Sequence, residues 1–184
     1  MRGRERRSFP RNFLVAATAA IALLVSAGTA AAAPTLTPKD SVEPALIARI
    51  NQVRADNHLP ALARNSLLTT AATKHSNNLA LVGAFRHEFR KNGSWVAFGS
   101  WIRWYWPGTG YVSWTAGENL AWGAPDLTPA QTVTAWMNSP GHRANLLGTW
   151  TNVGVAVLHV TAPIGYYRDY PQVTIVAAEF GRRT

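Results

Sequence analysis

VGVAVLHV at residues 153–160 and VTIVAAEF at residues 173–180 are the stretches that decide the fold of this chain. Both are dominated by β-branched and other apolar residues, at odd and even positions alike. A strand that is apolar on both faces is typically covered on both faces, because each face has to be removed from water. The two stretches therefore predict two neighbouring core strands near the end of the chain.

Three helices are predicted before these strands. The first covers residues 44–57, where apolar residues recur at helical spacing behind a proline suited to a first turn. The second covers residues 66–82 and stops at Gly83. The third follows Thr128, which forms a capping box with Gln131, and ends at a Ser-Pro-Gly tripeptide. Helices first and strands last predict an α+β layered sandwich.

Residues 89–117 show neither a helical nor a strand period, and they are crowded with aromatic residues. Five tryptophans fall within about twenty residues: Trp95, Trp101, Trp104, Trp106 and Trp114. One interpretation is a flap that packs onto the domain through its rings. The other is a platform for a lipid, sterol or sugar ring, with basic residues nearby to meet anionic headgroups.

The N-terminal 33 residues have the composition of a cleaved signal peptide: an arginine-rich start, an apolar run over residues 13–25 and then small residues. The apolar run is shorter than a transmembrane anchor needs. We therefore expect secretion to the extracellular space without a stable membrane anchor. The general secretory route fits best, although the Arg-Arg-Ser-Phe at residues 6–9 also resembles a twin-arginine signal. Residues 34–42 are predicted to be a linker, and residues 43–184 the folded domain.

Composition excludes several classes of function. The chain contains no cysteine, which removes thiol chemistry and disulfides and leaves stability to the core. From residue 34 onward, 13 lysines and arginines stand against 8 acidic residues, a net charge of +5. The basic residues are scattered rather than gathered in a run, so no nucleic-acid partner is expected.

Three segments carry candidate chemistry: FRH at residues 85–87, AGENL at 116–120 and WMNSPGHRANLL at 136–147. They precede the V-G-V-A-V of the first predicted strand. In this order and spacing they resemble bacterial members of the CAP superfamily, the SCP-like extracellular domains related to cysteine-rich secretory, antigen 5 and pathogenesis-related 1 proteins. The resemblance extends over roughly residues 45–181.

The resemblance implies an α-β-α sandwich with a central antiparallel sheet of about three strands and a surface cleft. Position by position, His87 matches the first cleft histidine, Glu118 the acidic residue and His142 the second histidine. Family members often bind a divalent metal through the two histidines, so His87 and His142 are the implied metal ligands. Ser139 stands where eukaryotic members have a second acid.

Two imidazoles and one carboxylate make an incomplete zinc site, because water would have to fill the remaining positions. We therefore expect any Zn²⁺ to be weakly held and optional. Glu118 is predicted either to accept a hydrogen bond from an imidazole or to hold a ligating water. The candidate ligand cleft comprises Glu118, Asn119, Ser139, Trp104 and Trp106. His75, on the apolar side of the second helix, is interpreted as a core histidine rather than a ligand.

Three functions remain open. The first is a binding module for a lipid, a sterol or a cell-envelope glycan. The second is a metal-assisted hydrolase of peptide or ester bonds, with Glu118, His87 and His142 as the candidate catalytic residues. The third is a structural or interaction protein with a vestigial cleft. The sequence lacks the second acid, the H-E-x-x-H motif and the G-x-S-x-G motif, which favours the first and third over an enzyme.

Overall fold

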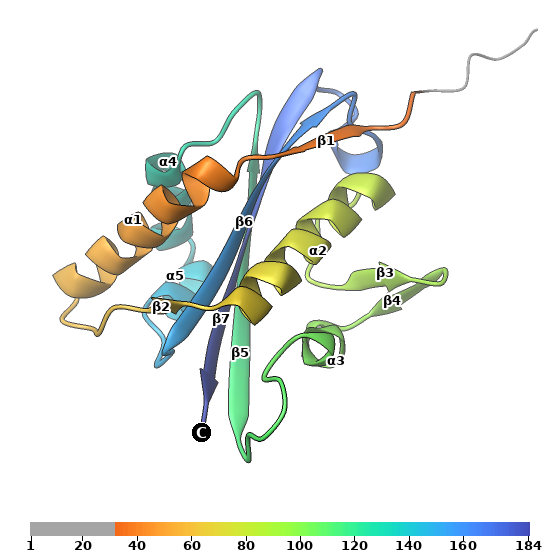
Figure 1. Ribbon diagram of the computed structural model, residues 1–184. Helices are drawn as coiled ribbons and strands as arrows, with labels where there is room; N and C mark the ends of the chain where they lie inside the picture. The colour runs from red at the N-terminus through yellow and green to blue at the C-terminus, as the bar shows by residue number, and fades with distance from the viewer. Residues whose placement is uncertain (1–31) are drawn as a thin grey trace, which may run out of the picture. The chain divides into compact units, whose positions relative to one another are not determined.

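Three long antiparallel strands form most of the sheet in this computed structural model, which describes residues 32–184 (Figure 1). β7 (Gln172–Arg183) lies between β6 (Asn152–Thr161) and β5 (Trp114–Gly123). Two short strands extend the sheet beyond β6: β1 (Thr35–Pro38), which is antiparallel to it, and β2 (Ala63–Arg64), which is parallel. β5 is therefore an edge strand of the described sheet. All but the last two residues of the predicted signal peptide lie outside the described residues.

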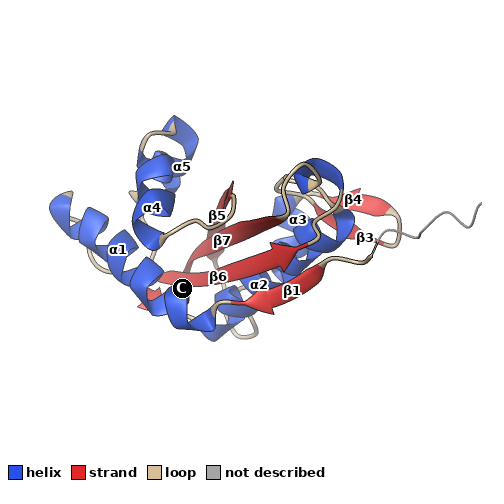
Figure 2. Cartoon of the chain, turned by 90° about the horizontal axis from the view of Figure 1, so that it is seen from above, coloured by secondary structure: helices blue, strands red, loops and turns tan. Residues whose placement is uncertain are grey.

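Helices cover both faces of the sheet, as Figure 2 shows from above. One face carries α1 (Glu43–Asp56), α4 (Pro129–Met137) and α5 (Pro140–Leu146), and the other carries α2 (Ser66–Val82) and α3 (Phe98–Trp101). The smaller elements are the hairpin β3 (Phe89–Lys91) and β4 (Ser94–Val96) and three 3₁₀ turns at Asp40–Val42, Ile102–Trp104 and Gly165–Tyr167. The predicted α-β-α sandwich is confirmed.

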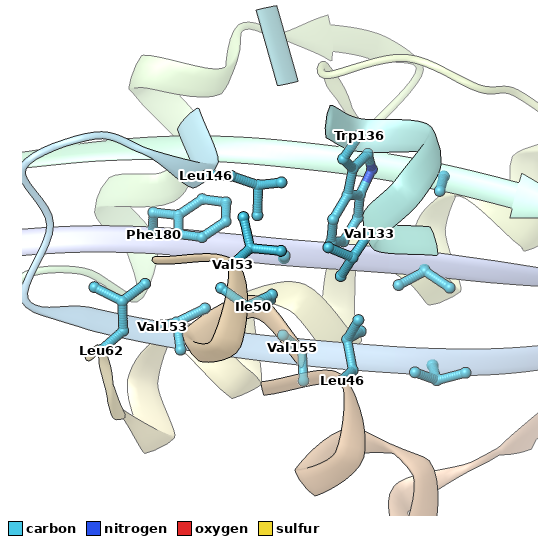
Figure 3. Close-up of a cluster of buried hydrophobic side chains, with 14 residues drawn as sticks. Leu46, Ile50, Val53, Leu62, Val133, Trp136, Leu146, Val153, Val155 and Phe180 are labelled. Atoms are coloured by element: carbon cyan, nitrogen blue, oxygen red, sulfur yellow. The ribbon is translucent and has the colours of Figure 1, made fainter. Parts of the chain in front are cut away.

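Successive residues of β7 point to opposite faces of the sheet, as strand geometry requires. Val176, Ala178 and Phe180 enter the core cluster beneath α1, α4 and α5, part of which is seen in Figure 3. Ile175 and Ala177 enter the cluster beneath α2. The same alternation in β5 turns Leu120, and with it Glu118, toward α2. It turns Asn119 toward α5.

Close packing fixes α2 on the sheet. A Cβ atom added to Gly154 on β6 would lie 2.0 Å from the backbone nitrogen of Thr69, so only glycine allows this helix–strand distance. α2 ends at Gly83, which has the left-handed conformation at φ 65° and bonds back to the carbonyl of Leu79. This placement presses the inward side of α2, including His75, against the strands.

All three predicted helices match the structure closely, and the capping box of Thr128 with Gln131 is confirmed. The prediction of a linker over residues 34–42 is wrong for Thr35–Pro38, which pairs with β6 as β1. Pro38 is tolerated there because an edge strand has backbone groups that need no partner. The segment around His142 is a helix rather than a loop, since Pro140 starts α5 instead of only ending α4.

The tryptophan-rich segment packs into the domain through some of its rings and not others. Trp101 and Trp106 are fully buried and share a core cluster with Leu68 of α2. Trp104 is 42% exposed. The packed flap therefore accounts for two of the five indoles and leaves an exposed one beside the hairpin.

Candidate functional site

Glu118 is the centre of the candidate site. Its side chain is 1% exposed, and it lies beneath α2, where the ring nitrogen Nδ1 of His75 is hydrogen-bonded to Oε2. The Nδ1 atom of His87 lies 2.6 Å from Oε1. Burial alone would raise the pKa of Glu118, but the hydrogen bonds from the two histidines outweigh it and its pKa is lowered. Glu118 is thus a buried carboxylate with both oxygens engaged.

His87 follows α2 and is held at both its backbone and its ring. The indole N–H of Trp101 donates to the His87 carbonyl at 2.8 Å. The hydrogen bond with Glu118 raises the pKa of His87, against the effect of burial. Because Nδ1 is occupied by Glu118, Nε2 is the ring nitrogen left for a ligand or metal. The side chain is 53% exposed, so the ring is partly open to solvent.

His142 reaches the same region from the other face of the sheet. It lies in the first turn of α5, and its carbonyl accepts a hydrogen bond of 2.9 Å from the side-chain amide of Asn119. Asn145 binds α5 to β5 again by donating to the carbonyl of Glu118 at 2.8 Å. Burial lowers the pKa of His142, and the positive charge of His87 lowers it further. The two histidines therefore approach the free edge of β5 from opposite faces of the sheet, close enough for the charge of His87 to act on His142.

A groove of about 330 Å³ follows this edge. Its walls come from the chain after α2, from β5, and from α4 and the start of α5; they are mainly apolar and include Phe85, Leu120, Trp122, Trp136, Ser139 and His142. The indole N–H of Trp136 donates to the carbonyl of Leu120 at 2.9 Å, which occupies an edge group of β5 that another strand would otherwise seek. The groove is open for side-chain contacts rather than for strand addition at that point.

The structure brings together only part of the predicted cleft. Glu118 contacts His87, and His142 and Ser139 line the groove. Asn119 is fully buried and holds the backbone of His142, so it does not line a ligand cleft. The assignment of Trp106 to the cleft is also wrong, because its ring is in the core and its indole N–H donates to Thr115.

Trp104 lies outside the groove as well. Its exposed ring packs against Phe89 of the hairpin, and the ammonium group of Lys91 lies 4.2 Å from the ring centre. It belongs to a separate surface.

Two residues of the site were not assigned to it from the sequence. His75 is buried, as expected of a core histidine, but its partner is Glu118. Glu179, fully buried on β7, stands opposite Glu118 in the β5–β7 register. For Glu179, the sequence signal was a charged residue within the otherwise apolar strand 173–180, because burying a carboxylate costs free energy unless it is paired.

The fold and the site together define an α-β-α sandwich with a histidine–glutamate cleft at one sheet edge. The chain belongs to the CAP family, described as the cysteine-rich secretory protein family, whose model matches residues 47–170. Over 42 residues it is 55% identical to the Bacillus subtilis protein YkwD, a stretch that is 22% of this chain and 16% of that protein.

Two solved structures share the fold. One is an extracellular SCP-domain protein from Bacillus anthracis, with 25% identity, a TM-score of 0.58, and coverage of 78% of this chain and 41% of that one. The other is an outer surface protein from Borrelia burgdorferi, with 21% identity, a TM-score of 0.60, and coverage of 82% of this chain and all of that one. The chain spans less than half the length of the two Bacillus proteins.

Proposed function

We propose that this protein is an exported binding module that holds the apolar part of a cell-envelope lipid in the groove at the edge of β5. The observation that carries the proposal is the groove itself, in which a mainly apolar wall ends at an imidazole. Its volume of about 330 Å³ falls within the range of small-molecule pockets, about 300–1,000 Å³. An acyl chain or a ring system would remove Phe85 and Trp122 from water.

The histidine end suits an anionic headgroup. Ser139 and His142 line this end of the groove. His87, whose pKa is raised, is close enough for its charge to lower the pKa of His142. A carboxylate or phosphate would find a cation and hydrogen-bond donors there. The same two imidazoles can hold a divalent metal such as Zn²⁺, which would act as a Lewis acid toward that headgroup. With two protein ligands, the metal would be weakly held and optional.

Binding is favoured over hydrolysis by the state of Glu118. A general base must have a free oxygen within reach of the water that it activates. Both oxygens of Glu118 are engaged by His75 and His87, and the side chain is 1% exposed. Ser139, at the position of the family's second acid, cannot replace it as a base.

Export is supported by the signal-peptide composition of residues 1–33 and by the extracellular description of the Bacillus anthracis relative. No helix from residue 32 onward has the length and apolar character to cross a bilayer. A basic and aromatic surface around the β3–β4 hairpin would face anionic envelope polymers. In it, Arg86 and Arg90 lie 4.4 and 5.0 Å from the ring centre of Trp95, and Lys91 covers Trp104.

Binding of a dansyl-labelled undecanoic acid to the purified protein tests the proposal. Ala135 lines the groove and is exposed on α4. Ala135→Phe should therefore fill the groove and lower the affinity for the probe at least about tenfold. Thr134→Phe, on the same helix but outside the groove, should bind the probe as the wild type does. Equal affinity in all three proteins, or no saturable binding to the wild type, would reject the groove as the site.

A further inference from the structure

A second group of ionisable side chains lies beneath the cleft, between α2 and the sheet. Glu179 on β7 is fully buried and faces Glu118 directly across the β5–β7 ladder. His75 on α2 is fully buried beside them. Neither carboxylate oxygen of Glu179 has a hydrogen-bond partner among residues 32–184. The function proposed above makes no use of Glu179.

Two carboxylates in one closed interior site require compensation. An unpaired buried anion is costly, and a buried polar group without a partner needs an explanation such as an ion. Glu118 has its two histidines, whereas Glu179 has only the nearby negative charge of Glu118. The group that completes this site must therefore be positive: either a proton or a metal ion.

The contacts of His75 are those of a metal ligand. Its Nε2 lies 3.3 Å from the carbonyl oxygen of Glu88, a contact that needs the ring proton on Nε2. Without a metal, Nδ1 donates its own proton to the Glu118 carboxylate, and a metal ion would replace that proton and take the Nδ1 lone pair. A histidine whose second nitrogen donates to a backbone carbonyl is the usual arrangement of a metal ligand.

The donor atoms are close enough to share one ion. One ring nitrogen of His75 and one oxygen each of Glu118 and Glu179 all lie within 4.8 Å of one another. Tetrahedral Zn²⁺, with bonds of about 2.0–2.2 Å, separates its ligand atoms by about 3.3 Å, which small side-chain adjustments would reach. Glu179 has two unpartnered oxygens, so the three residues can supply four donors.

We propose that His75, Glu118 and Glu179 form a buried, structural binding site for Zn²⁺, separate from the His87–His142 pair at the surface. The site is closed over by Trp101, whose ring centre lies 4.6 Å from that of His75. A closed site leaves no room for the water ligands that Mg²⁺ retains, so Mg²⁺ is excluded. The ion is taken up as the chain folds and exchanges slowly afterwards.

The test refolds the full chain with Zn²⁺, removes free metal by gel filtration with a mild chelator, and measures retained zinc by mass spectrometry. Wild type and His142→Ala should each retain about one ion per chain. Glu179→Gln, which preserves shape and removes the charge, should retain less than a tenth as much. Zinc should raise Tm by about 5 °C in the first two proteins and leave that of Glu179→Gln unchanged.

Several results would overturn the site. They are no retained zinc in folded wild type, equal retention in Glu179→Gln, or loss of retention in His142→Ala, which would place the ion in the cleft. If Glu179→Gln does not fold, His75→Gln replaces it, with the same expected loss. If the wild type folds without zinc, the compensating positive charge is a proton held by Glu118 and Glu179. Lipid-probe binding is measured separately, so failure of the groove proposal would leave this result unaffected.

Discussion

The Nδ1 atom of His87 lies 2.6 Å from Oε1 of Glu118, and the contact leaves Nε2 as the ring nitrogen not bound to the carboxylate. The carboxylate would therefore act on a ligand bound as proposed through the histidine rather than directly. His142 approaches from the opposite face of the sheet, so the cleft depends on two helical layers meeting at the edge of β5.

The first prediction concerns protonation. Because its hydrogen bond with Glu118 raises the pKa of His87, the ring should titrate above 6.5, and Glu118→Gln should bring it back toward that value. Burial and the charge of His87 lower the pKa of His142, which should titrate below 6.5. Titration of metal-free protein followed by NMR of the histidine rings measures both. Identical midpoints for the two rings would contradict the geometry of the site.

The raised pKa of His87 also makes the stability of the fold depend on pH. A histidine with a raised folded-state pKa stabilises fully below its unfolded pKa, near 6.5, and this stabilisation disappears as pH rises through the folded value. Since His87 is half exposed, we expect less than about 1 kcal/mol.

Surface zinc binding should depend on both cleft histidines. We expect His87→Ala and His142→Ala each to lower the zinc affinity of the folded protein at least about tenfold, because each removes one of two protein ligands. Calorimetric titration measures this affinity. Glu179→Gln should keep the heat, since Glu179 is fully buried. Unchanged heat in both alanine variants would show that the zinc lies elsewhere.

Arg54 should be a large contributor to stability. Its buried guanidinium donates to the carbonyls of Pro60, Leu146 and Gly148, each at 2.9 Å, and so holds the end of α5. Arg54→Leu leaves these carbonyls without a partner and should cost about 3 kcal/mol in urea denaturation. Arg49→Leu, exposed on the same helix, should change stability by less than about 0.5 kcal/mol. Similar costs for the two variants would refute this role.

Substitutions of Trp104 and Trp106 should distinguish the buried part of the tryptophan-rich segment from its exposed part. Trp106 is fully buried, so Trp106→Ala should lower the free energy of unfolding by about 3–5 kcal/mol. Trp104 is exposed, and Trp104→Ala should cost less than about 1 kcal/mol. Thermal and urea denaturation check this difference, and a reversed order would mean that the packing is misassigned.

The sequence predicted the regular elements well wherever local signals agreed. Helix Ser66–Val82 was found because its apolar period ends at a glycine, and β6 and β7 because their apolar runs fit only covered strands. β5 was missed because it contains Gly117, Glu118 and Asn119, residues that disfavour strands and are kept there by the site.

Tertiary contacts decided what the sequence could not show. Glu179 gained a role only when register placed it opposite Glu118, and a pattern of apolar residues carries no such information. Asn119 and Trp106 look like cleft residues by composition, yet strand alternation and core packing turn them inward. The family motif located His87, Glu118 and His142, but not the groove beside them.

NMR of the tryptophan indole groups during addition of dodecanoate tests the central claim, that the groove is the ligand site, most directly. We predict saturable shifts for Trp122 and Trp136, which line the groove, together with the ring of His142. Trp95 and Trp104 of the hairpin surface should stay unchanged. Shifts confined to Trp95 and Trp104, or no saturable shift at any indole, would contradict the claim.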